Sequence, residues 1–171
     1  MKLFIETTLS DMTLILFNDE KKYVSIKKNL KKKSDALASS ISELLSTNNV
    51  AFDELAAIYI TLGPGSFMGA RASFVYARTF ANIRSIDLYS ISTIKLLAVS
   101  NDSTIAHIHS KDNVYFEYKD GVESLVELLQ PSLSTLDNFI EDPNAYIGMF
   151  DKANIDSLTP NYIKDPTIGG A

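Results

Sequence analysis

A chain of 171 residues, 46% of them apolar, is long enough to bury a hydrophobic core as one domain or as two small lobes. It has no cysteine, which excludes disulfides, a thiolate nucleophile and sulfur metal sites, and its formal net charge of −5 argues against a free-standing nucleic-acid binder. No apolar run reaches the roughly 18 residues of a membrane helix, and the first residues lead into a strand rather than a signal peptide. We therefore expect a cytoplasmic globular protein without a membrane partner.

The first hundred residues predict three antiparallel strands followed by alternating helices and strands. Apolar residues that alternate with polar ones, or form short runs between turns, predict the strands. Residues at helical spacing, Leu37, Ile41 and Leu44 among them, predict the first helix, with Ser34 as its N-cap. The predicted strands span residues 3–8, 12–17, 23–26, 58–62 and 86–91, and the predicted helices span 34–45, 67–82 and 93–99.

This β-β-β-α-β-α-β-α order is that of an α/β, ribonuclease H-like lobe, the plan shared by the actin, sugar kinase and Hsp70 superfamily. An antiparallel hairpin is extended by parallel strands through right-handed crossovers. We assign this lobe to residues 1–100, and a reduced second lobe with a C-terminal tail to residues 101–171. In the second lobe we expect a hairpin over 104–118, a short helix over 123–129, a strand over 145–150 and an irregular tail over 151–171.

The most informative stretch is the loop before the second helix, Gly63-Pro64-Gly65-Ser66-Phe67-Met68-Gly69-Ala70-Arg71. A glycine-rich turn between a strand and a helix is where α/β folds bind phosphate. However, a dinucleotide fingerprint would need glycine at Met68, and a Walker loop would need Lys-Ser or Lys-Thr after its last glycine. Pro64 also removes a backbone donor. The loop therefore lacks the groups that hold phosphate, and Ser66 is expected to cap the helix.

The same nine residues resemble the Gly-Pro-Gly-Ser-Phe-Thr-Gly-Leu-Arg signature of the bacterial TsaB (YeaZ) family, with Met68 for Thr and Ala70 for Leu. Residues 4–8 are similar to the opening Ile-Asp-Thr-Ser strand of that family, although Glu6 replaces Asp, and 161–164 are similar to a late Pro-x-Tyr-Leu-Arg motif. The resemblance implies a non-catalytic scaffold subunit without a cofactor. It would belong to the complex that installs N6-threonylcarbamoyladenosine at position 37 of tRNAs.

The partners implied by the resemblance are the catalytic paralogue TsaD and the ATPase TsaE, with tRNA bound only by the complex. The helices over 34–45 and 67–81 would pack side by side and meet the same two helices of TsaD, and the same face would permit a homodimer when the partner is missing. The second helix is small or apolar almost all round, which is typical of a helix buried on both sides. The expected contact residues are Leu37, Ile41, Phe67, Ala70, Phe74, Ala77 and Arg78. The alternative is a stripe packed on its own sheet.

A second functional hypothesis is a small ATP-dependent kinase or hydrolase of the same superfamily. The turn over residues 7–11 contains no glycine to let its backbone approach a phosphate, and Glu6 alone makes a poor magnesium site. His107 and His109 lie on one face of a predicted strand and could bind zinc with Asp112. Without a His-Glu-x-x-His motif we predict no metal site and no catalytic residue.

The lysines between the third strand and the first helix are a further candidate site. Five of them crowd into seven positions: Lys27, Lys28, Lys31, Lys32 and Lys33. Such a charge run is usually a solvated connection. The alternative is a contact with RNA or with an acidic partner.

Overall fold

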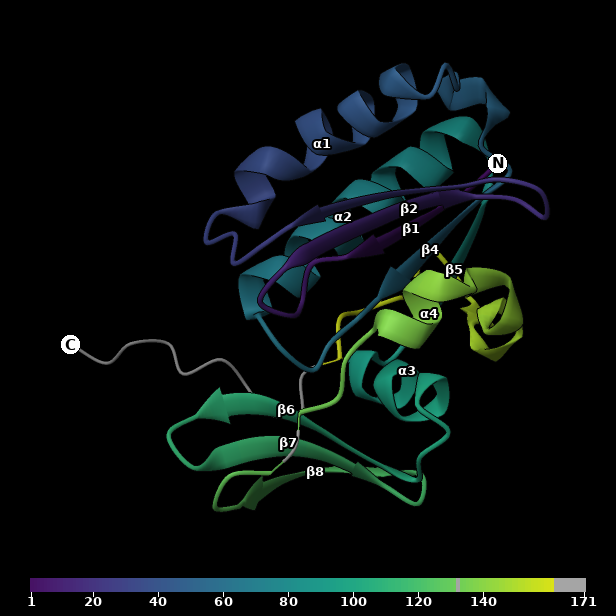
Figure 1. Ribbon diagram of the computed structural model, residues 1–171. Helices are drawn as coiled ribbons and strands as arrows, with labels where there is room; N and C mark the ends of the chain where they lie inside the picture. Colours follow the sequence, from purple (N-terminus) through teal and green to yellow (C-terminus); the bar gives the residue numbers. More distant parts are fainter. Residues whose placement is uncertain (132, 162–171) are drawn as a thin grey trace.

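Nine strands form two sheets in the computed structural model of the chain, which describes residues 1–131 and 133–161 (Figure 1). The strands are β1 Lys2–Glu6, β2 Met12–Phe17, β3 Lys22–Lys27, β4 Ala57–Thr61, β5 Asp87–Ile91, β6 Ile105–Lys111, β7 Val114–Lys119, β8 Val122–Glu127 and β9 Asp151–Lys152. The α-helices are α1 Lys33–Thr47, α2 Phe67–Arg84, α3 Thr93–Ser100 and α4 Asp137–Glu141, and 3₁₀ turns lie at Phe52–Glu54, Pro143–Ala145 and Ile147–Met149. Residues 162–171, which include most of the segment compared above with a late family motif, lie outside the described residues. The irregular tail predicted over 151–171 is wrong at its start, because Asp151–Lys152 forms β9.

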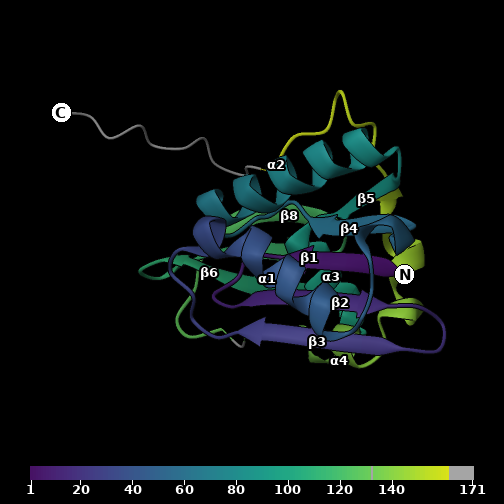
Figure 2. The same cartoon turned by 90° about the horizontal axis from the view of Figure 1, so that it is seen from above.

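The larger sheet has the order β3-β2-β1-β4-β5-β9. β1 pairs antiparallel with β2 and parallel with β4, and β4 pairs parallel with β5. Helices α1 and α2 cover one face, while α3 and α4 lie on the other (Figures 1 and 2). Side chains of β1 alternate between these layers, since Leu3 and Ile5 face α1 and α2 and Phe4 faces α3 and α4. The predicted ribonuclease H-like lobe is confirmed.

Serine N-caps were predicted for helices α1 and α2, and of the two only α2 has one in the structure. Ser66 precedes α2, and its Oγ accepts a hydrogen bond from the Gly69 amide at 3.1 Å, as expected. The prediction of Ser34 as the N-cap of α1 is wrong, because α1 begins one residue earlier, at Lys33. Ser34 lies inside the first turn, and its hydroxyl donates to Asp35 Oδ1 at 3.1 Å.

The second sheet has the order β6-β7-β8, and only part of it was predicted. The hairpin of β6 and β7 is confirmed. The helix predicted over 123–129 is wrong: Val122–Glu127 forms β8, which pairs antiparallel with β7 along its whole length. The spacing of apolar residues in this segment fits both a helix and a strand. Tertiary contacts decide between the two, and here the segment pairs with the edge of β7. The strand predicted over 145–150 is also wrong, since the chain forms 3₁₀ turns there before β9.

Residues 137–152, which the sequence places in the second lobe, lie against the first sheet. The ring of Phe139 is fully buried, and its centroid lies 4.5 Å from that of Phe4. Phe150 meets Phe4 edge-on at 6.2 Å. β9 then extends the larger sheet beside β5. The core on this face of the larger sheet is therefore completed by chain that follows β8.

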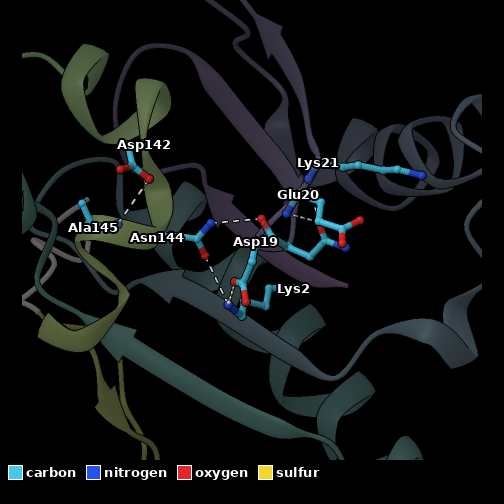
Figure 3. A network of polar contacts seen from close by, with 8 residues as sticks. Lys2, Asp19, Glu20, Lys21, Asp142, Asn144 and Ala145 are labelled. Carbon is cyan, nitrogen blue, oxygen red and sulfur yellow. Dashed lines mark hydrogen bonds and ion pairs between the residues drawn. The ribbon is translucent and has the colours of Figure 1, made fainter.

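Polar contacts hold the same returning segment at the far end of the first hairpin (Figure 3). Asn144 Nδ2 donates to the Asn18 carbonyl at 3.0 Å, and Lys2 Nζ donates to Asn144 Oδ1 at 3.2 Å. Lys2 also forms an ion pair with Asp19 at 3.3 Å. Asn144 thus joins the 3₁₀ turn Pro143–Ala145 to β1 and to the β2–β3 turn.

Candidate functional site

The glycine loop before α2 closes directly onto the turn between β1 and β2. A Cβ at Gly65, whose φ is +143°, would lie 2.5 Å from the Thr8 carbonyl oxygen, and a Cβ at Gly69 would lie 1.9 Å from that of Thr7. The Ser66 amide donates to the Thr8 carbonyl at 2.6 Å. Only glycine permits such an approach of backbone to backbone. These glycines therefore serve contact between the loop and the turn.

Glu6, at the end of β1, is the acid that replaces the family aspartate. Its carboxylate is fully buried and accepts hydrogen bonds from the amides of Thr8 and Leu9 and from the Thr61 hydroxyl. Burial raises the pKa of the Glu6 carboxyl, and the hydrogen bond from Thr61 opposes that shift. The acid that could bind magnesium is thus surrounded by donors, and two turn amides that could bind phosphate point at it.

Thr93, the first residue of α3, completes this closed network. Its hydroxyl lies 2.8 Å from that of Thr8 and accepts a hydrogen bond from the Gly63 amide at 3.1 Å. The Thr93 amide donates in turn to the Gly63 carbonyl at 2.7 Å. The signature loop is consequently bonded to the β1–β2 turn on one side and to α3 on the other. Sequence reasoning missed this role of Thr93.

Four of the seven predicted contact residues lie in the core of the chain. Leu37 and Ala70 are each 2% exposed, and Ile41 and Ala77 are fully buried. They pack α1 and α2 against the sheet, which corrects their assignment to an outer contact surface. The small side chains at 70 and 77 let α2 approach its own sheet closely.

The other three predicted contact residues lie on α2 and are half-buried. These are Phe67, Phe74 and Arg78, and the Arg78 guanidinium lies 5.8 Å from the centre of the Phe74 ring. They remain accessible at the side of the helix. Arg71, the last residue of the signature, is exposed and lines a groove between α1 and α2.

The outer stripe of α2 consists of Met68, Val75 and Ile83, and it lies on the second side of the helix, which the all-round apolar sequence predicted as a contact side. These side chains are 59%, 51% and 72% exposed, respectively. Their spacing of seven and eight residues places them on one side of the helix. The groove beside them, formed with α1, is floored by Ala72 and Tyr76. The sequence contains this information. Once the small residues of α2 are assigned to the side that meets the sheet, the large apolar residues Met68, Val75 and Ile83 are left on the opposite side.

Of the five lysines before α1, only Lys33 is buried, while the other four are exposed or half-buried. Lys27 forms an ion pair with Glu43 at 3.3 Å, and Lys28 forms one with Asp11 at 2.8 Å, whose carboxylate raises the pKa of the Lys28 ammonium. Lys33 is buried, and its ammonium donates a hydrogen bond to the Leu9 carbonyl oxygen. The remaining two lysines, Lys31 and Lys32, are exposed.

Both histidines are engaged within the β6–β7 hairpin. His107 Nε2 lies 2.9 Å from Glu117 Oε2 on the neighbouring strand, and His109 Nε2 lies 3.0 Å from the Asp112 carbonyl oxygen. Over residues 1–131 and 133–161, no three acidic or histidine side chains gather so as to hold a metal ion. In the same part of the chain, no helix has the length and apolarity needed to cross a membrane.

Comparison with known proteins assigns the family. A family model described as TsaD, tRNA N6-adenosine threonylcarbamoyltransferase, matches residues 27–140, which is more than half of the chain. An uncharacterized Pseudomonas aeruginosa protein with similarity to peptidase YeaZ matches in structure with a TM-score of 0.75 and 13% identity, covering 95% of this chain and 99% of the other. YeaZ from Pseudomonas aeruginosa matches with a TM-score of 0.71 and 13% identity, covering 94% and 98%. No curated protein matches the sequence. The chain belongs to the TsaD family, and its fold is that of YeaZ (TsaB), as its signature loop implied.

Proposed function

We propose that the chain is the non-catalytic, TsaB-type scaffold subunit of a complex that installs N6-threonylcarbamoyladenosine at position 37 of tRNAs. Membership of a family of tRNA-modifying proteins supports the pathway. The outer stripe of α2, exposed beside α1, is the observation that carries the scaffold role. Large exposed apolar side chains that lie on one side of a helix favour a protein interface there.

The closed β1–β2 turn supports a subunit without chemistry of its own. A phosphate-binding turn needs unpaired backbone donors and a carboxylate that can reach a metal ion. Here the amides of Thr8 and Leu9 donate to Glu6, and Gly69 packs on Thr7. We infer that the chain keeps the fold of a nucleotide-binding superfamily and binds no ATP by itself.

The partner that fits the α1–α2 face is a catalytic, TsaD-like paralogue that presents the same pair of helices. Two related subunits can join through equivalent helices in a four-helix contact, which would also allow a homodimer of this chain. A TsaE-like ATPase joins this pair, and tRNA binds only to the assembled complex. In this arrangement Met68, Val75 and Ile83 are buried at the contact, with Arg71 at its edge.

The test is co-expression of the chain with the TsaD-like paralogue from the same cell. Val75→Glu places a charge in the proposed contact and should abolish co-elution on size exclusion, because an unpaired buried charge strongly opposes association. Val122→Glu is the matched control, since Val122 is 65% exposed on β8 and lies outside the proposed contact. The reconstituted modification of tRNA, measured by nucleoside mass spectrometry, should be lost with Val75→Glu alone.

Two outcomes would reject this proposal. A folded Val75→Glu variant that co-elutes like the wild type would move the contact away from α2. Micromolar, magnesium-dependent binding of ATP to the isolated chain would instead favour the small kinase or hydrolase.

A further inference from the structure

A cleft of about 600 Å³ lies between the two sheets, and the proposed scaffold role does not use it. The β1–β2 turn and the end of β3 form one wall, while β6 and the segment before α4 form the other. No residue of the outer stripe of α2 lines it. Its volume is within the range of small-molecule sites. Apolar side chains, including Leu133, Leu136 and Ile140, cover much of its surface.

Lys33 lines this cleft and is 8% exposed. Its ammonium donates one hydrogen bond, to the Leu9 carbonyl, although an ammonium has three donors. Within the described residues no carboxylate forms an ion pair with it, and Glu6 and Asp11 act on it only from farther away. Desolvation accordingly lowers the pKa of Lys33. A buried cation without a paired anion is costly and is usually matched by an opposite charge.

The other charged groups of the cleft already have close partners. Lys28, the second lysine of the cleft, forms its ion pair with Asp11 at 2.8 Å. Asp137, the second carboxylate of the cleft, keeps its charge but is exposed to water, and it accepts a hydrogen bond from the Thr135 hydroxyl at 2.8 Å. His107 lies against Glu117. An entering ligand therefore meets one cation that lacks an anion, beside apolar walls.

We infer that this cleft binds a small organic anion, with its carboxylate or phosphate on the Lys33 ammonium and its apolar body between Leu133, Leu136 and Ile140. A single anionic group fits, because the turn amides next to Lys33 donate to Glu6 and offer no cradle for a polyphosphate. Charge-assisted hydrogen bonds to an ammonium give such a group its affinity and its position.

Binding can be tested on the whole chain with three small aromatic probes: benzoate, phenyl phosphate, and the uncharged benzamide, which has the shape of benzoate. The chain has two histidines, His107 and His109, and both line the cleft, so their ring protons report on it in proton NMR spectra. We expect saturable shifts of these resonances with benzoate or phenyl phosphate, and binding of benzamide weaker by about tenfold. Comparing the two anions distinguishes a carboxylate ligand from a phosphate ligand.

Lys33→Met should weaken binding of the preferred anion by about tenfold, because it removes the charge and keeps most of the length of the side chain. Lys31→Met, at an exposed lysine two residues away, is the matched control and should bind like the wild type. Equal affinity for benzamide, unshifted histidine resonances, or a Lys33→Met variant that binds like the wild type would each overturn the inference. If Lys33→Met does not fold, the comparison of charged and neutral probes on the wild type decides alone.

Discussion

Gly69, in the first turn of α2, rests against the carbonyl oxygen of Thr7 in the β1–β2 turn, where a Cβ would lie 1.9 Å from that oxygen. The Thr7 hydroxyl donates to the Gly69 carbonyl at 2.7 Å, so the two residues are also joined by a hydrogen bond. A glycine inside a helix normally costs about 1 kcal/mol relative to alanine. The contact with Thr7 explains why the signature nevertheless has glycine here.

Gly69→Ala should therefore lower the free energy of unfolding by about 2 kcal/mol or more, against the sign of helix propensity, because the new methyl group meets backbone that cannot move cheaply. Urea denaturation measures this. Gly148→Ala is the control: no atom lies within 4 Å of its Cβ position, so a change of about 0.5 kcal/mol or less is expected. A Gly69→Ala variant as stable as the wild type would mean that α2 does not contact the turn.

The buried Glu6 carboxyl should make stability depend on pH. Burial raises its pKa above the ordinary value of 4.5, so the folded chain holds this proton at pH values where the unfolded chain has lost it. The contribution of Glu6 to stability is then fully present below pH 4.5 and is lost as the pH rises through the folded pKa. The loss is at most about 1.4 kcal/mol per pH unit.

Glu6→Gln removes this titration and keeps a group that can accept from the turn amides. The stability of the wild type relative to Glu6→Gln, measured by urea denaturation at several pH values, should therefore fall as the pH rises above 4.5. A difference that is constant with pH would show that the Glu6 pKa is the same in the folded and unfolded chain.

Strands β1 to β5 of the larger sheet could be predicted because each is marked twice, by an apolar run and by the turns on either side of it. The segments 58–62 and 86–91 predicted β4 and β5 to within a residue at each end. The loop 63–71 could be identified for the same reason, since its glycines and Ser66 each meet a backbone requirement that can be read locally. Its contact with the β1–β2 turn could not be read, because the two segments are distant in the sequence.

What could not be predicted depends on packing between distant segments. Val122–Glu127 has a pattern compatible with a helix, and pairing with β7 makes it a strand. Helix α2 is apolar or small on every side, so its sequence does not say which side meets the sheet, and Ala77 was placed outside. Lys33 lies among other lysines, and nothing in the local sequence sets it apart from them. Its burial depends on the distant β1–β2 turn, where the Leu9 carbonyl accepts a hydrogen bond from its ammonium.

The two sides of α2 can be separated by paired substitutions. Ala77→Arg should unfold the chain, because residue 77 is fully buried and the core has no partner for a charge. Val75→Arg should keep the stability of the wild type to within about 0.5 kcal/mol, since Val75 is 51% exposed. Circular dichroism and thermal melting of the isolated chain measure both. A stable Ala77→Arg variant would show that residue 77 lies on the outer contact surface and not in the core.

Helix α4 packs on the larger sheet through the ring of Phe139. Phe139 is fully buried, and its ring centre lies 4.5 Å from that of Phe4. Phe139→Ala should therefore lower the free energy of unfolding by about 3–5 kcal/mol, because it removes a large buried side chain and leaves a cavity. Leu129→Ala is the control, since Leu129 is 87% exposed and should change stability by about 0.5 kcal/mol or less. If both variants melt like the wild type, α4 does not contribute to the core beside β1, and residues 137–152 would belong with the second sheet alone.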